Sequence, residues 1–227
     1  MNKKILIIPV YNKSFLIEKA IRLIGDHLSD FTVLFVDDGS VDNTIIKITP
    51  DEQIKYLKHE LHQGYGASLI SGFEFAIMNE FDKIYTADID YPDFYKAVHD
   101  LDDKSDSYDM VNCSRIEIPE NKERLRRIGV DNRISVRLNT LLDLYICDFF
   151  SPFKYFNAEI IKKIDFTEYD MNVIIQIWIQ SLYNKAVLCE VFSPCVSKET
   201  INESDVLKRD YEYYFLFMDG EIILYPL

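Results

Sequence analysis

The sequence predicts an α/β fold in which a mostly parallel central sheet is flanked by helices, with further elements and a β-hairpin at the C-terminal end. Two observations lead to this prediction. Short apolar runs of strand length alternate with segments whose apolar residues recur at helical spacing, and Asp- and Gly-rich clusters follow the runs. The alternation implies crossover connections and helices on both faces of the sheet. Such sheets bind ligands at the carboxyl ends of their strands, where these clusters fall.

The first half of the chain contains four runs of strand type with helical segments between them. Strands are expected at residues 5–10, 31–36, 54–57 and 83–87, of which the third has a weak signal. Helices are expected at residues 15–28 and 65–78, with a short helix from about residue 41.

The second half has a different pattern. An acidic stretch at residues 100–109 is interpreted as a solvated loop before a fifth strand at 110–114. A basic segment at 115–137 follows, then helical stretches up to about residue 183 and a strand at 186–192. We therefore divide the chain into residues 1–114 and 115–227, as two halves of one domain.

Residues 211–226 have the pattern of a β-hairpin. Aromatic and aliphatic residues flank Asp219-Gly220, a pair that supplies the positive φ angles of a type I′ turn. So apolar a hairpin is not expected to expose both faces to water. Packing on the core is the simpler interpretation, and contact with a second copy in a homodimer or with a membrane surface is the alternative.

The composition excludes several classes of protein. The 227 residues carry a formal net charge of -13, which repels polyanions and argues against nucleic-acid binding. The four cysteines form no CxxC pair, so we expect neither a disulfide framework nor a structural zinc site. No apolar run is long enough to span a membrane. A cytoplasmic protein is expected, with peripheral attachment at the inner face of the membrane left open.

Two clusters after the strands are candidates for nucleotide binding. Asp37 and Asp38 follow the second strand, where a carboxylate can accept hydrogen bonds from ribose hydroxyls or a base N–H; a helix-capping turn is the alternative. Gly64 and Gly66 open a helix, and such a glycine pair lets the backbone approach a ligand. Close helix packing explains the glycines equally well.

A third cluster has the chemistry of a metal site. Asp88 and Asp90 stand two residues apart just beyond a strand, so a turn there would let both carboxylates converge on one Mg²⁺ or Mn²⁺ ion. Such a cation bridges a diphosphate and neutralises the leaving group. A charged turn without a ligand is the alternative, since Tyr91-Pro92-Asp93 comes next.

Four segments in this order resemble the family 2 glycosyltransferases with the GT-A fold, and among them the polyprenyl-phosphate sugar transferases such as dolichyl-phosphate mannose synthase. The matching segments are residues 7–12 (IIPVYN), 36–44 (VDDGSVDNT), 64–72 (GYGASLISG) and 87–92 (ADIDYP). They cover the first hundred residues. Four motifs in the same order make chance agreement improbable.

The resemblance implies a role for each matching residue. Those expected around the nucleotide of a UDP- or GDP-linked sugar are Pro9, Tyr11, Asn12, Asp37, Asp38, Gly64 and Gly66. Asp88 matches the family's central metal ligand, and Asp90 falls where this branch often has a second ligand. The resemblance also implies inversion at the transferred sugar.

Three residues depart from the family pattern. Thr86 replaces the first acid of the family's Asp-x-Asp, so either Asp88 and Asp90 form the metal pair or metal affinity is reduced. Lys13 stands where this branch usually has Glu, and His62 where it usually has Asn. Lys13 bears on the identity of the base more than on the chemistry.

The basic segment is the clue to the acceptor. Seven basic residues outnumber four acidic ones there, and Arg115 and Arg133 are the candidates for catalysis; the basic residues are Arg115, Lys122, Arg124, Arg126, Arg127, Arg133 and Arg137. An arginine fork suits phosphate oxygens, and a phosphate acceptor needs no protein base. A hydroxyl acceptor would need one, for which Asp148 and Asp170 are candidates. A solvated, self-paired helix is the alternative interpretation.

These observations predict a metal-dependent, inverting glycosyltransferase whose residues 1–114 bind the nucleotide sugar and whose residues 115–227 bind the acceptor. The acceptor expected is a polyprenyl phosphate or a cell-surface glycan precursor. Thr86 keeps a second hypothesis open, a non-catalytic nucleotide-sugar-binding or scaffolding protein. A sugar nucleotidyltransferase ranks last, because Tyr11-Asn12 stands where that class needs a glycine-rich loop with a basic residue.

Overall fold

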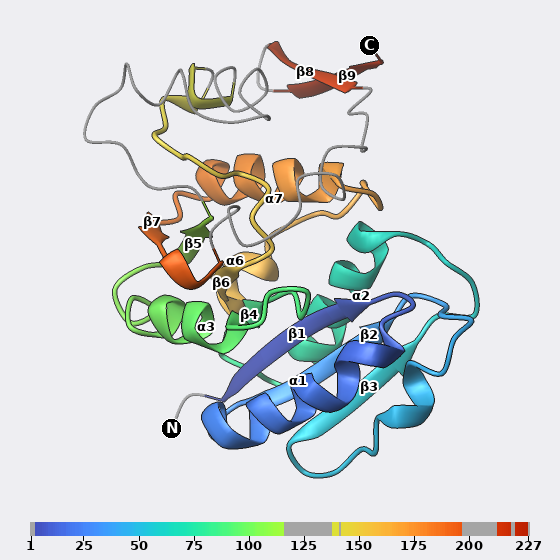
Figure 1. The fold of residues 1–227 in the computed structure, drawn as a ribbon. Coiled ribbons are helices and arrows are strands. Elements are labelled where there is room, and N and C mark those ends of the chain that lie inside the picture. The colour runs from blue at the N-terminus through green and yellow to red at the C-terminus, as the bar shows by residue number, and fades with distance from the viewer. Residues whose placement is uncertain (1–2, 116–137, 141, 197–212, 219–220, 227) are drawn as a thin grey trace. The chain divides into compact units, whose positions relative to one another are not determined.

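A computed structural model describes residues 3–115, 138–140, 142–196, 213–218 and 221–226. The chain divides into two compact units, Met1–Ser197 and Lys198–Leu227. The first unit contains a seven-stranded sheet, and the second contains a two-stranded one. The larger unit therefore holds every strand that the sequence predicts before the hairpin (Figure 1).

The seven strands lie in the order β3-β2-β1-β4-β6-β5-β7. All run parallel except β6, which is antiparallel to β4 and to β5. Their bounds are β1 Lys4–Val10, β2 Thr32–Asp37, β3 Ile54–Lys58, β4 Lys83–Thr86, β5 Met110–Ser114, β6 Lys154–Asn157 and β7 Leu188–Phe192. The predicted fold class, a mostly parallel sheet flanked by helices, is confirmed.

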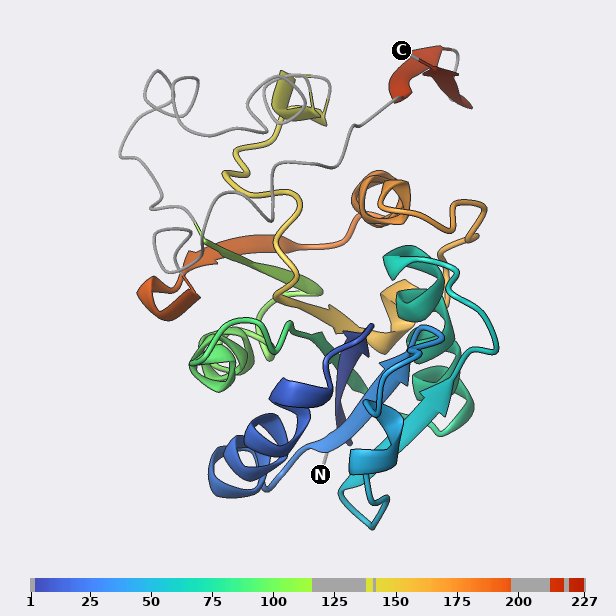
Figure 2. The ribbon, with the colours of Figure 1, turned by 45° about the vertical axis from the view of Figure 1, so that its right-hand side comes forward.

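Helices cover both faces of this sheet. Figure 2 shows α1 and α3 on one side and α2 with α6 on the other, and α7 contacts α2. The helices are α1 Ser14–His27, α2 Tyr65–Met78, α3 Phe94–Asp102, α6 Ala158–Ile161 and α7 Asn172–Tyr183, with 3₁₀ turns η1 Ile45–Lys47 and η2 Pro194–Val196. The core lies between these layers, and the side chains of residues 5–8 and 33–36 are fully buried in it.

The structure differs from the predicted elements in three places. The acidic stretch at 100–109 is not all loop, because α3 extends to Asp102. Strand β6 lies inside the region predicted to be helical up to residue 183. The short helix expected from about residue 41 is reduced to the single turn η1, because the Asp42 carboxylate accepts the Thr44 N–H (2.8 Å) and holds a turn there.

The smaller unit contains the predicted hairpin. Strands β8 Tyr213–Met218 and β9 Glu221–Pro226 are antiparallel, and Met218 pairs with Glu221. This register leaves a two-residue connection at positions 219–220, as the Asp-Gly signal predicts. Among the described residues, no helix has the length and apolar character needed to cross a membrane.

Candidate functional site

The candidate site lies at the carboxyl ends of β1, β2 and β4. The last hydrogen bond between β1 and β4 joins the Ile7 carbonyl to the Ala87 N–H (3.2 Å), and Pro9 comes two residues later. Pro9, which has no N–H to donate, is tolerated inside β1 because β4 has already ended beside it. β1 therefore extends beyond β4. The segments that follow β1, β2 and β4 all leave the same edge of the sheet.

Side chains tie the segment after β1 to the segment after β2. The Asn12 N–H donates to the Ser40 hydroxyl (2.8 Å), and the Asn12 side-chain oxygen accepts the Val41 N–H (3.0 Å). Asn12 has a φ of 52°, in the left-handed region that Asn tolerates better than most residues. Asn12 therefore holds the two loops together, in a position predicted to contact the nucleotide.

Asp38 is buried and ties the end of β2 to the start of α2. Its carboxylate accepts the backbone N–H groups of Gln63 (2.9 Å) and Gly64 (2.7 Å), and it also contacts the side chains of His59 (2.9 Å) and His62 (2.7 Å). Burial alone would raise the pKa of Asp38, but these hydrogen bonds lower it below its ordinary value. Both oxygens of the Asp38 carboxylate thus already have partners within the protein.

Asp37, its neighbour, is also buried but is not used in this way. One carboxylate oxygen accepts the Ser40 N–H (3.2 Å). The other, Oδ2, is buried and has no hydrogen-bond partner among the residues that the structure describes. A buried carboxylate oxygen without a partner is costly, so Asp37 is the strongest candidate in this edge for an interaction with a ligand.

Tyr11 lies next to this pair. Its ring stacks on His62, with ring centroids 4.1 Å apart and planes 24° from parallel. The Asp38 carboxylate contacts Nδ1 of the same His62 ring (2.7 Å). Tyr11 and His62 thus form an exposed two-ring surface at the end of β1.

Gly64, the residue before α2, and Gly66, within the first turn of α2, have different surroundings. Gly64 has a φ of 100°, a backbone conformation that residues other than glycine rarely adopt. Its N–H donates to the Asp38 carboxylate. A Cβ on Gly66 would lie 2.1 Å from the Asp170 carbonyl oxygen, and Tyr169 accepts the N–H of Ala67 (2.8 Å). The chain at 169–170 therefore fills the space beside Gly66, which favours close packing as the reason for this glycine.

Asp88 and Asp90 lie together after β4. The Asp88 carboxylate accepts the Asp90 N–H (2.9 Å). Burial and the neighbouring Asp90 charge raise the pKa of Asp88, while Lys13 and Arg115 oppose that rise. The two acids repel each other enough for a cation to be favoured beside them.

That cation is supplied in the structure by Lys13. Its ammonium lies 2.6 and 2.5 Å from the two carboxylate oxygens of Asp90. Thr86 does not join the acids, because its hydroxyl is buried and donates to the Pro152 carbonyl (2.7 Å). The sequence shows Lys13 only as a departure from a pattern; nothing local indicates that it reaches a residue 77 positions away.

Carboxylate oxygens are the donors that Mg²⁺ and Mn²⁺ prefer, so Asp88 and Asp90 fit such a cation in kind. Within the described part of the chain, no third His, Cys, Asp or Glu joins them to complete a metal-binding group. A diphosphate would have to provide further oxygens. Lys13 would also have to leave Asp90 for that carboxylate to serve as a ligand.

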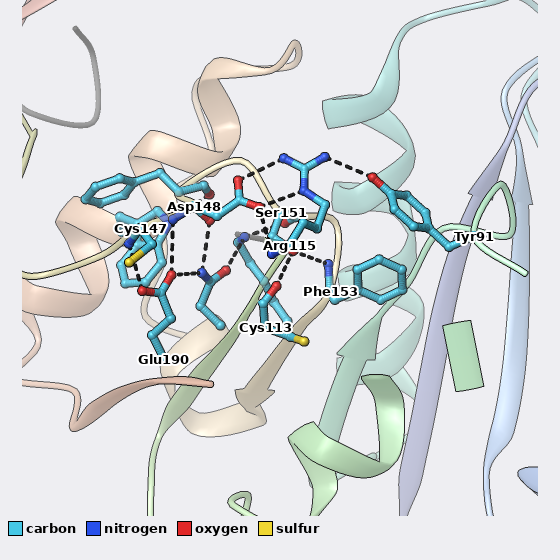
Figure 3. Close-up of polar contacts among 12 residues, drawn as sticks. Tyr91, Cys113, Arg115, Cys147, Asp148, Ser151, Phe153 and Glu190 are labelled. Carbon is cyan, nitrogen blue, oxygen red and sulfur yellow. Dashed lines mark hydrogen bonds and ion pairs between the residues drawn. The ribbon is translucent and has the colours of Figure 1, made fainter. Parts of the chain in front are cut away.

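Arg115 belongs to a buried network beside this edge (Figure 3). Its guanidinium makes a bidentate ion pair with Asp148, at 2.7 and 2.8 Å, and donates to the Tyr91 hydroxyl (3.2 Å). Both partners of the ion pair are nearly inaccessible. Arg115 is therefore not an exposed fork for an acceptor phosphate. Asp148, which the sequence analysis names as a candidate general base, is the buried counter-ion of Arg115.

The same network continues to Lys154 and Glu190. Asn112 links them: its amide donates to Glu190 (2.7 Å) and its oxygen accepts from the Lys154 ammonium (2.7 Å). Burial lowers the pKa of Lys154 to about 7, although Asp148 opposes this. Two basic and two acidic side chains thus belong to one network that joins β5, β6 and β7.

Two further predicted residues need separate mention. Arg133, with most of the basic segment, lies outside the described residues. Asp170, the other candidate general base, accepts the Asn172 N–H (2.7 Å) before α7, and its backbone lies against Gly66.

The chain matches the family profile described as "Glycosyl transferase family 2" over residues 5–165. It is also similar to CsbB of Bacillus subtilis (strain 168), provisionally assigned as a glycosyltransferase, with 27% identity over 122 residues. That alignment covers 48% of the chain and 35% of CsbB, so the match spans about a third of that relative.

Solved structures of glucosyl-3-phosphoglycerate synthase from Mycobacterium tuberculosis have a similar fold. The complex with Mn²⁺, UDP-glucose and phosphoglyceric acid has a TM-score of 0.63 and 16% identity, covering 84% of this chain and 69% of the other. The UDP complex has a TM-score of 0.65 and 15% identity, covering 100% and 88%. At such identities the likeness concerns the fold.

Proposed function

The chain belongs to glycosyl transferase family 2, and we propose that it transfers a sugar from a UDP- or GDP-linked donor to an acceptor with inversion. One observation carries the proposal. Contacts from Asp90 to Lys13, and from Asn12 to Ser40, join the segments after β4, β1 and β2 at one sheet edge. A nucleotide sugar needs groups for its base at one end and for its diphosphate at the other, and the residues joined at this edge support both roles.

The residues divide into those that touch the donor and those that hold the loops. Asp37, with its unpartnered buried oxygen, and the exposed Tyr11 are proposed to contact the nucleoside, next to Pro9. Asn12, Asp38, Gly64 and Gly66 are proposed to act indirectly, because their polar groups or adjoining space are already occupied by the protein.

Asp88 and Asp90 would hold Mg²⁺ or Mn²⁺, which when bound neutralises the diphosphate leaving group. An oxygen of an acceptor phosphate, which carries no proton to be removed, forms the new bond at the anomeric carbon as the bond to the diphosphate breaks on the opposite face, and the electron pair leaves with the diphosphate. A hydroxyl acceptor would also have to give its proton to a base. Mn²⁺ and UDP-glucose in the complex of the mycobacterial synthase support this choice of donor and cation.

The acceptor is proposed to be a polyprenyl phosphate or a cell-surface glycan precursor. The basic residues at 115–137 support an anionic acceptor, and Arg133 is the candidate for contacting it. A lipid-phosphate acceptor would place the reaction at the inner face of the membrane. Arg115 is proposed to act through Asp148 and Tyr91, as a positioning residue.

The test is binding and turnover of UDP-glucose and GDP-mannose with Mn²⁺. Wild type should hydrolyse or transfer one of these sugars, and Asp88→Ala should lose at least ~100-fold in rate. Asp37→Asn should bind the nucleotide about tenfold more weakly without loss of stability, because a charge-assisted hydrogen bond to the ligand is lost. Asp93→Asn, which removes an exposed carboxylate paired with Lys96, is the control. Full activity in Asp88→Ala would refute the proposal.

A second function remains in competition, a nucleotide-sugar-binding protein without catalysis. The hydroxyl of Thr86 bonds Pro152, and Lys13 occupies Asp90, so the acidic site is smaller than the family pattern. Calorimetry distinguishes the two: nucleotide binding with no hydrolysis or transfer to any lipid-phosphate or glycan acceptor would favour the binder.

A further inference from the structure

Lys13 is fixed at its backbone and extended at its side chain. Its N–H donates to the Thr44 hydroxyl (2.8 Å), and its carbonyl accepts the N–H groups of Leu16 and Ile17 at the start of α1. From this fixed position the ammonium reaches both oxygens of Asp90. Only the side chain has to move for the pair to open.

The Lys13–Asp90 pair is accessible. About 29% of the Lys13 side chain and 38% of the Asp90 side chain are exposed. Ion pairs of such exposure contribute little to stability and are screened by water and salt. The pair can therefore exchange partners easily, unlike the buried pair of Arg115 and Asp148.

We propose that Lys13 is a tethered cation that competes with the divalent cation for Asp90. In the free protein the ammonium takes the carboxylate, so a divalent ion binds weakly. A donor diphosphate offers Lys13 another anion, and Asp90 is then released to the metal. Lys13 thus couples cation uptake to donor binding and acts as a positioning residue. This inference rests on the proposed function for the identity of the donor.

The electrostatic argument gives the expected direction. Removing one positive charge from within hydrogen-bond distance of Asp90 increases the attraction of the acid pair for a second cation. Screening at this exposed position reduces the effect, and about a tenfold gain in Mn²⁺ affinity is expected. No other lysine in the described residues forms an ion pair with Asp88 or Asp90.

The experiment measures Mn²⁺ binding to the full chain without nucleotide, by electron paramagnetic resonance of the free ion. Lys13→Gln should bind Mn²⁺ about tenfold more tightly than wild type, and Lys13→Arg, which keeps the charge, should remain close to wild type. Lys47→Gln is the matched control, because Lys47 is similarly exposed and pairs with Glu18 (3.1 Å). Circular dichroism checks that each variant is folded.

Two further measurements test whether the change in Mn²⁺ affinity arises at Asp90. The gain in Lys13→Gln should disappear when Asp90→Asn is added, because the competition is for that carboxylate. Adding UDP should tighten Mn²⁺ binding more in wild type than in Lys13→Gln, because the variant has no competitor to remove.

Three results would overturn the inference: an unchanged Mn²⁺ affinity in Lys13→Gln, an equal gain in Lys47→Gln, or a gain that persists with Asp90→Asn. Absence of Mn²⁺ binding in every variant would overturn it as well. Sugar transfer is measured separately. If the protein transfers a sugar but Lys13→Gln does not change the Mn²⁺ affinity, the proposed function stands and the inference about Lys13 is wrong. If Lys13→Gln raises the Mn²⁺ affinity but no sugar is transferred, the inference stands and the proposed function is wrong.

Discussion

Asp37 and Asp38 are adjacent in the sequence, are both buried, and differ in what their carboxylates contact. Asp38 accepts hydrogen bonds from two backbone N–H groups and contacts two histidines, whereas one oxygen of Asp37 has no partner in the described part of the chain. A carboxylate with a full set of partners stabilises the fold, and one with an unused oxygen is available to a ligand. Neighbouring acids of one motif therefore divide structural and binding roles.

Asp38→Asn is expected to lower the free energy of unfolding by about 2–3 kcal/mol. The amide cannot accept at both of its positions, so at least one buried partner of Asp38 loses its bond. Urea denaturation with a fixed slope measures the loss. Asp93→Asn, at an exposed site, should change stability by less than about 0.5 kcal/mol. Equal effects of the two substitutions would contradict the structural role of Asp38.

The same residue predicts part of the acid response. The folded-state pKa of Asp38 lies below its ordinary value of 3.8, so its contribution is present above that pH and is lost as pH falls through the folded pKa. The difference in stability between wild type and Asp38→Asn should therefore shrink below about pH 4. A difference that grows on acidification would contradict this sign.

At the residue scale the sequence predicted where the acidic motifs lie in the fold but not how their side chains pair. Asp37, Asp38, Asp88 and Asp90 all lie at the predicted sheet edge. The pairing of Lys13 with Asp90, and of His59 with Asp38, depends on how loops far apart in sequence meet. Spacing along the chain carries no information on such contacts.

At the scale of elements, two of the three segments that differ from the prediction show why local pattern was insufficient. The apolar positions of α3 are Phe94, Ala97, Val98 and Leu101, which follow helical spacing but overlap an acidic run. Strand β6 has four residues and pairs antiparallel with β4 and β5, from which it is separated by long segments. Its strand state comes from these tertiary partners.

The close approach of α2 to the chain at 169–170 gives a prediction at this scale. Gly66→Ala should destabilise the protein by about 2 kcal/mol or more, because the added Cβ would lie 2.1 Å from a backbone oxygen that cannot rotate away. Gly25→Ala in α1 is the matched control, since nothing lies within 4 Å of its Cβ position. That substitution should stabilise by about 0.5–1 kcal/mol through helix propensity.

Thermal unfolding of the two variants measures both effects. Destabilisation in Gly66→Ala together with stabilisation in Gly25→Ala is the expected pair of results. A stable Gly66→Ala protein would mean that the segment at 169–170 can move away from α2. Close packing would then no longer explain this glycine, and its predicted contact with the nucleotide would gain support.

At the scale of the whole molecule, buried and half-buried ionisable groups tie the second half of the sheet together. Arg115, Asp148, Lys154 and Glu190 come from or adjoin three strands, and Asn112 connects them. Removing one member of such a set leaves an unpaired buried charge. This network crosses the predicted division at residue 114, because Asn112 on one side bonds Glu190 and Lys154 on the other.

The final prediction concerns the two compact units. All seven strands of the large sheet, and Asp37, Asp38, Asp88 and Asp90, belong to the unit Met1–Ser197. A chain ending at residue 197 should fold and should show the same rise in melting temperature with UDP and Mn²⁺ as the full chain, because the ligand binds only the folded state.

A chain ending at residue 187 is the control. It lacks β7 and Glu190, which pair with β5 and Asn112, and should lose cooperative unfolding. Loss of the UDP response in the 197-residue chain would show that residues 198–227 are needed for the site or for its stability.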